Sequence, residues 1–235
     1  LIVRHLKQQG APDYDLAKSD KAVEFLKRVL ADDPGDATAL ESLEKLYSRE
    51  ERFAELLEVY RKKVELAADP AEREQILFRM AYLWEEMLHN VDSAIGTYKE
   101  VLALDSANGQ ALKALDRLFL LQKQWPALAD NLSRQLELTD DKNLQVDLLV
   151  RLAALRETEL KEVANAVDTY RQVLDLDATN EIAAGALERL VQKPEHELQV
   201  ATILEPVYKA RNEWQRLVDV YEIMVRHAGD AVRKI

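Results

Sequence analysis

Cysteine is absent from this chain of 235 residues. Its absence excludes disulfides, thiolate nucleophiles, and zinc or iron–sulfur sites built on cysteine. A chain without cysteine fits a periplasm as well as a reducing cytoplasm, and of the two we favour the cytoplasm. Glycine and proline number six each, and aromatic residues make up 6% of the chain. Because no apolar run reaches about 18 residues, the sequence predicts no membrane insertion.

Sequence signatures of catalysis and metal binding are also missing. The stretch Asp175–Glu181 superficially resembles a calcium loop, but it lacks glycine at the sixth place and has Ala186 at the twelfth. We interpret it as a turn that caps a helix. The histidines are far apart and form no HExxH pair, which favours surface positions over metal ligation: His5, His89, His196 and His227. Without a phosphate loop or nucleophile elbow, we predict no enzyme, no cofactor, no metal and no small-molecule substrate.

Charge and apolar residues dominate what is present. Apolar residues make up 48% of the chain and charged residues 32%, and the net charge is −11. Such compositions are typical of long amphipathic helices. Tight binding to nucleic acid or to an anionic membrane needs clustered lysine and arginine, so the acidic balance disfavours both partners.

A long internal period organises the sequence. Ala22, Ala94 and Ala166 begin successive copies of one phrase, spaced by about 72 residues. In each copy Val-Leu follows after seven residues and Asp after eleven. Because a fixed period of this kind is the signature of stacked repeats, we predict one solenoid over residues 1–235. We expect it to be a fragment of a longer protein, with repeat blocks of about residues 1–36, 37–108, 109–180 and 181–235.

Each complete block is predicted to hold four amphipathic helices, and the whole chain about 13. Apolar residues recur at spacings of three and four, and breaks such as Pro34-Gly35 and Asp69-Pro70 separate the helices. A short helix is also expected over residues 1–7, before Gly10–Asp13. The predicted helices of the two complete blocks are 38–49, 53–67, 70–88 and 92–103, then 110–121, 125–138, 142–160 and 164–176.

The last block departs from the period by about one helix. We predict this insertion near residues 192–213, with a helical stretch over 198–212 that changes the local superhelical twist. Pro206 is expected to bend or break this stretch, unless it marks the first turn of a separate helix. The repeat phrase resumes at Trp214, which we expect to be buried like Phe53 and Trp125. Apolar faces near the two ends are expected to be exposed or covered by a neighbouring molecule: Leu1, Ile2, Val3 and Val225.

The half-blocks resemble tetratricopeptide repeats, in particular the long, divergent ones of bacteria. A small residue opens the second helix, as Ala94 and Ala166, and an aromatic follows four residues later, as Tyr98 and Tyr170. An apolar pair and a Leu-Asp turn complete the pattern. The resemblance implies an all-α fold, a right-handed superhelical α-solenoid of stacked antiparallel helix pairs. It also implies that the first helices line a concave groove that binds a peptide or protein segment.

One set of side chains is a candidate for such binding. The groove sides of the first helices are expected to present basic residues and a tyrosine: Lys45, Arg79, Tyr82, Lys113, Arg117, Arg151 and Arg189. Because the guanidinium fork bonds carboxylates bidentately, this column suggests an acidic ligand. The alternative is that these residues pair within helices, as Glu41 with Lys45, and bridge neighbouring helices.

The sequence thus predicts a non-enzymatic protein–protein interaction scaffold. A structural spacer or self-association module within a larger multi-repeat protein is the alternative. An RNA-binding helical repeat is disfavoured, because no polar code repeats from unit to unit.

Overall fold

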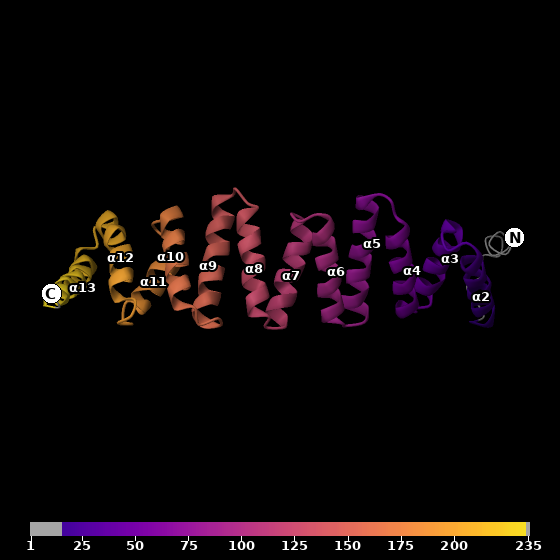
Figure 1. Cartoon of the computed structure of the whole chain (residues 1–235), viewed down its shortest axis with the longest axis horizontal. Coiled ribbons are helices and arrows are strands. Elements are labelled where there is room, and N and C mark those ends of the chain that lie inside the picture. Colours follow the sequence, from indigo (N-terminus) through magenta and orange to yellow (C-terminus); the bar gives the residue numbers. More distant parts are fainter. Residues whose placement is uncertain (1–15, 234–235) are drawn as a thin grey trace. The chain divides into compact units, whose positions relative to one another are not determined.

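The computed structural model describes residues 16–233, and all of their regular structure is helical (Figure 1). The all-α prediction is confirmed. The predicted helix over residues 1–7, and the predicted exposure of Leu1, Ile2 and Val3, lie outside the described residues. The helices are α2 (Leu16–Asp32), α3 (Ala37–Arg49), α4 (Phe53–Leu66), α5 (Pro70–Tyr82), the π-helical turn η1 (Leu83–Met87), α6 (Val91–Leu104), α7 (Gly109–Leu121), α8 (Trp125–Glu137), α9 (Lys142–Thr158), α10 (Val163–Leu176), α11 (Glu181–Leu190), α12 (Glu197–Arg211) and α13 (Trp214–Arg233).

The described residues form two compact units, one up to Ala114 and one from Leu115 onward, and the boundary between them falls within α7. From α2 to α6 in the first unit, and from α8 to α13 in the second, consecutive helices pack against one another as antiparallel neighbours (Figure 1). We call α3, α5, α7, α9 and α11 first helices, and α4, α6, α8 and α10 second helices. Among residues 16–233, no helix has both the length and the apolar character needed to cross a membrane.

The turn before every other first helix is built in the same way. Asp36 accepts a hydrogen bond from the backbone N–H of Ala39 at 2.7 Å and begins α3. Asn108 and Asn180 make the equivalent bonds at 3.0 Å and begin α7 and α11. Side-chain acceptors at this position satisfy N–H groups that the helix itself leaves unpaired. The period of the sequence therefore corresponds to the recurrence of the same capped helix start.

The turn from a first to a second helix has its own backbone signature. Glu51 and Lys123 adopt left-handed conformations, with φ of 56° and 55°. Asn212, which precedes α13, has φ of 58°. Because this region disfavours residues other than glycine and asparagine, its recurrence marks a constrained turn. By this signature, α12 joins α13 as a first helix joins a second.

Alanine is placed where helices cross. Ala81 and Ala94 in the first unit, and Ala153 and Ala166 in the second, are fully buried at 0% exposure. A methyl side chain lets two backbones approach to the short end of the 8–10 Å range of interhelical distances. These alanines explain why the repeat phrase opens with a small residue.

Residues 192–213, where the sequence predicts an added helix, contain α12. Pro206 neither breaks this helix nor starts a separate one, because α12 continues from Glu197 to Arg211. Burial on both sides of the proline opposes a break: Leu204 is 1% exposed and Val207 is 7% exposed. Packing thus outweighs the one backbone hydrogen bond that proline removes.

The expectation that Trp214 is buried is also wrong. Its side chain is 61% exposed, whereas Phe53 and Trp125 are half-buried. The two half-buried residues lie on helices that a further helix covers, α4 under α5 and α8 under α9. No described helix covers α13 in this way. Val225 is 71% exposed, as predicted.

Candidate protein-binding surface

All the predicted binding residues lie on first helices. Lys45, Arg79, Tyr82 and Lys113 belong to the first unit, and Arg117, Arg151 and Arg189 to the second. Arg151 is half-buried and the others are exposed. The structure thus places the predicted column as two sets, one in each unit.

In the first unit, a single carboxylate organises the site. Glu44 on α3 accepts a hydrogen bond from the Tyr60 hydroxyl of α4 at 3.3 Å and forms an ion pair with Arg79 of α5 at 3.1 Å. Lys63 of α4 forms a further ion pair with it. The Glu44 side chain is only 19% exposed, whereas Arg79 is 56% exposed. The half-buried carboxylate therefore holds an arginine that still faces solvent.

The second unit repeats this arrangement as a ladder, which we define by three pairs. Arg151 of α9 contacts Asp116 of α7 at 2.6 Å, and Arg189 of α11 contacts Glu157 of α9 at 3.6 Å. The third pair joins α13 to α11 at 2.7 Å: Arg216 and Glu188. Each pair thereby links an arginine to a carboxylate on the helix two places earlier in the chain. Exposed pairs of this kind contribute about 0–1 kcal/mol each to stability.

Tyrosines from the neighbouring helices complete the carboxylate sites. The Tyr170 hydroxyl donates to Glu157 at 2.9 Å, and the Tyr208 hydroxyl donates to Glu188 at 2.8 Å. Asp116 has no such donor, because Leu132 stands where the period places the tyrosine of the first unit, and its Oδ1 atom is buried without a hydrogen-bond partner. Through Tyr208, α12 also acts as the second helix of α11.

The pairing bears directly on the two alternatives for the basic column. Arg79, Arg151 and Arg189 bridge neighbouring helices, which is the structural role considered above. Arg117 is also engaged in an interaction. Among the described residues, Lys45 and Lys113 make no hydrogen bond or ion pair, and Tyr82 is 53% exposed. The charges of Arg79, Arg151 and Arg189 are therefore balanced by carboxylates, while their side chains remain partly exposed to solvent.

Sequence reasoning missed the carboxylates, although a signal was present. Glu44, Asp116 and Glu188 recur with the same spacing as the alanines. They occupy a position where the family pattern has a small residue. A recurring acid in place of a small residue, next to recurring arginines, indicates an internal ion pair.

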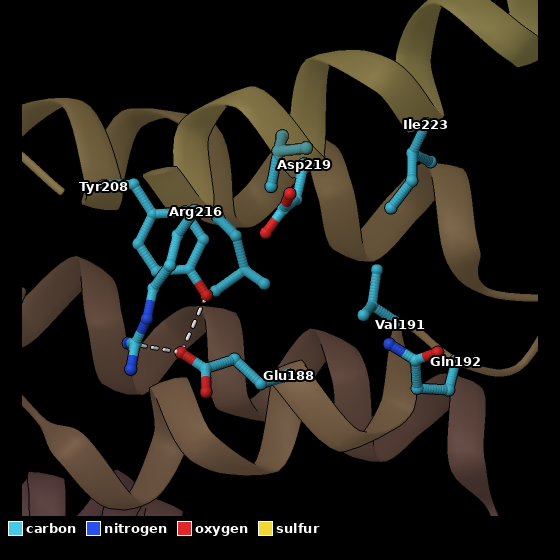
Figure 2. Close-up of a pocket in the computed structure, with 9 residues that line it drawn as sticks. Glu188, Val191, Gln192, Tyr208, Arg216, Asp219 and Ile223 are labelled. Carbon is cyan, nitrogen blue, oxygen red and sulfur yellow. Dashed lines mark hydrogen bonds and ion pairs between the residues drawn. The ribbon is translucent and has the colours of Figure 1, made fainter. Parts of the chain in front are cut away.

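A pocket of about 330 Å³ lies beside the last pair of the ladder, between α11, α12 and α13. Figure 2 shows Tyr208 and Arg216 converging on Glu188 from one side. Asp219 on α13 lines the pocket together with Gln192 and apolar side chains. No group of three acidic or histidine side chains in the described part of the chain could hold a metal ion.

The comparison with protein families matches one part of the repeat. The tetratricopeptide repeat model matches residues 39–74, which span α3, α4 and the start of α5. The same helix starts and crossings recur along the chain with the period of the sequence. The match and this recurrence support a divergent tetratricopeptide-like repeat protein. Its sequence matches no curated protein.

Similar solved structures of this repeat class share little sequence with the chain. MamA is 14% identical over 83% of this chain and 93% of its own, with a TM-score of 0.38. YrrB, described as a TPR protein with an unusual peptide-binding site, is 13% identical over 74% and 85%, with a TM-score of 0.39. A human IFIT1 dimer with m7Gppp-AAAA is 16% identical over 87% and 50%, with a TM-score of 0.42. These values transfer no ligand to the present tetratricopeptide-like protein.

The buried tyrosines of this repeat protein are expected to make it less stable at alkaline pH. Burial, together with the hydrogen bond to a carboxylate, raises the pKa of Tyr170 and of Tyr208 above the ordinary value of about 10. The folded state therefore keeps protons that the unfolded state releases. This contribution to stability is complete below about pH 10 and is lost as the pH rises towards the folded-state pKa.

We accordingly expect the unfolding free energy to fall more steeply above about pH 10 in the natural chain than in a Tyr170→Phe, Tyr208→Phe variant. Urea denaturation followed by circular dichroism at stepped pH measures both slopes. The comparison cancels the titration of lysines, which both proteins share. Parallel slopes would show that these hydroxyls titrate as in the unfolded chain.

Proposed function

We propose that this protein is a non-enzymatic scaffold that binds an acidic peptide or protein segment on the face that the first helices form within a unit. The observation that carries the proposal is the ladder of the second unit. Each of its arginines is held by a carboxylate that is more buried than the arginine itself: the exposed fractions are 40% against 14%, 67% against 16%, and 49% against 33%.

A carboxylate that holds an arginine in this way fixes the position of the guanidinium before a ligand binds. A guanidinium has five N–H donors, and Arg151 donates one of them, at Nη2, to Asp116. The remaining donors of a half-exposed arginine can bond a carboxylate of a partner without a further loss of side-chain freedom. Lys45, Lys113 and Tyr82 offer comparable exposed groups in the first unit. The net charge of −11 favours a protein segment over a nucleic acid as the partner.

A random peptide library displayed on phage and panned against the full chain tests this proposal. We expect enrichment of peptides rich in Asp and Glu, and at least about tenfold weaker binding of the selected peptides to an Arg151→Gln, Arg189→Gln variant. Each lost charged hydrogen bond contributes about 1.5–3 kcal/mol, so two such losses suffice. Raised salt should weaken binding in the same direction.

The matched control replaces two exposed basic residues outside the first helices, Arg171→Gln on α10 and Lys209→Gln on α12. This control is expected to bind like the natural chain, and circular dichroism checks that all three proteins fold equally. Selected peptides without acidic residues, or equal binding by both variants, would contradict the proposal. Self-association without any selected peptide would instead favour the spacer or self-association function.

A further inference from the structure

The helix α13 carries apolar residues on two of its sides. One side is packed against the rest of the second unit through Leu217 and Val220, which are 5% and 3% exposed. The other side is a stripe at helical spacings of four, three and four residues. We call these residues the α13 stripe, and their exposed fractions are 61%, 50%, 41% and 71%: Trp214, Val218, Tyr221 and Val225.

The repeat shows what covers such a stripe elsewhere. The turn at Asn212 and the phrase that begins at Trp214 align α13 with α4 and with α8. In α4 the aligned Leu57 and Tyr60 are 5% and 7% exposed, and in α8 the aligned Leu132 is 1% exposed. In both cases the covering element is the next first helix, α5 over α4 and α9 over α8.

The two covering helices share one side-chain pattern, two adjacent apolar residues followed after two positions by an apolar residue and alanine. Every member of the pattern is 5% exposed or less: Ile76, Leu77, Met80 and Ala81 in α5, and Leu148, Leu149, Leu152 and Ala153 in α9. The alanine permits the close crossing, and the apolar residues fill the space over the second helix. This pattern therefore describes the chemistry that fits a stripe of this type.

We propose that the α13 stripe binds a partner's amphipathic helix that carries this apolar–apolar–x–x–apolar–Ala pattern, in the place that α9 takes on α8. A depression of about 410 Å³ along Val218, Tyr221 and Val225 offers room for its side chains. Glu222 and Arg226 line the same depression and can pair with charges on the incoming helix. This surface is distinct from the first-helix face and takes an apolar ligand in place of an acidic one.

A second copy of the described chain does not supply this helix. The pattern occurs in α5 and α9, and in both it is buried within the unit that contains it. A folded copy could present it only by opening that unit. A helix from another protein segment carries no such cost, because it orders on the surface that it covers.

Binding of a synthetic peptide tests the proposal. The probe is a peptide of the sequence of residues 142–160, amidated and acetylated at its ends, added to the full chain. Burial of an exposed tryptophan shifts its emission to shorter wavelength, so the titration is followed by the fluorescence of Trp214. We expect a saturable blue shift that is absent in a Trp214→Phe variant, and affinity at least about tenfold weaker for Val218→Glu, Val225→Glu.

Two controls make the result specific. Ile182→Glu, Leu198→Glu changes two exposed apolar residues of the same unit away from the stripe, and it should bind the peptide like the natural chain. A peptide that carries Leu149→Glu and Leu152→Glu should not bind. Absence of binding by the unmodified peptide, or equal binding by both protein variants, would overturn the proposal. So would a dimer in sedimentation equilibrium that the stripe variant abolishes, because a second copy would then be the occupant.

Discussion

Leu187→Ala is expected to lower the free energy of unfolding by about 2–5 kcal/mol. Leu187 is 0% exposed and belongs to the apolar core that α10, α11 and α12 share in the second unit. Truncation to alanine removes buried methyl groups and leaves a cavity that the close-packed neighbours cannot fill. The expected loss is large for this site because α11 has only ten residues, from Glu181 to Leu190, and depends on packing for its stability.

Ile182→Ala is the matched control for this experiment. Ile182 lies on the same helix, but it is 64% exposed, so its truncation should change the unfolding free energy by no more than about 0.5 kcal/mol. Urea denaturation followed by circular dichroism measures both variants against the natural chain. Equal losses for the two variants would mean that α11 is not packed as the structure shows.

The repeat explains why so much of this fold is predictable from sequence. Stacked repeats bury the same positions in every copy, so the spacing of small and apolar residues reports burial directly. Ala94 and Ala166 open the repeat phrase in the sequence, and both are fully buried. The caps at Asp36 and Asn180 likewise follow from residue types that satisfy free N–H groups at helix starts.

The missed features depend on what a helix meets, which a local pattern does not contain. Trp214 fits the phrase of a second helix, yet its exposure is set by the absence of a covering helix in the described chain. Pro206 is a helix breaker by its own chemistry, but burial on both sides of it maintains α12. The arginines were recognised, whereas Glu44 and Asp116 were not, because an ion pair between helices joins residues that are far apart in the sequence.

The carboxylate positions also separate a binding role of the first helices from a structural one. Arg79 and Arg151 are spaced by the repeat period, and each pairs with an acid on the preceding first helix. A purely structural bridge needs only this contact, whereas a binding face also needs the exposed edge of the guanidinium. The glutamine variants remove both, so their effect on folding must be subtracted from their effect on peptide binding.

Ala166→Leu is expected to lower the free energy of unfolding by about 1–3 kcal/mol, because the crossing has no room for three further carbon atoms. Ala166 is 0% exposed at the start of α10, where this helix meets α9. The added side chain forces either the two backbones apart or neighbouring side chains out of their preferred rotamers. Thermal and urea denaturation of the variant measure the loss.

The repeat provides both a replicate and a control for this change. Ala94→Leu places the same side chain at the equivalent crossing of the first unit, where exposure is again 0%, and a loss of similar size is expected there. Ala164→Leu adds the same atoms to an exposed position on α10 and should change stability by no more than about 0.5 kcal/mol. If Ala166→Leu proved as harmless as Ala164→Leu, small size at this position would have no packing cause. The alanine that recurs in every copy of the phrase would then need a different explanation.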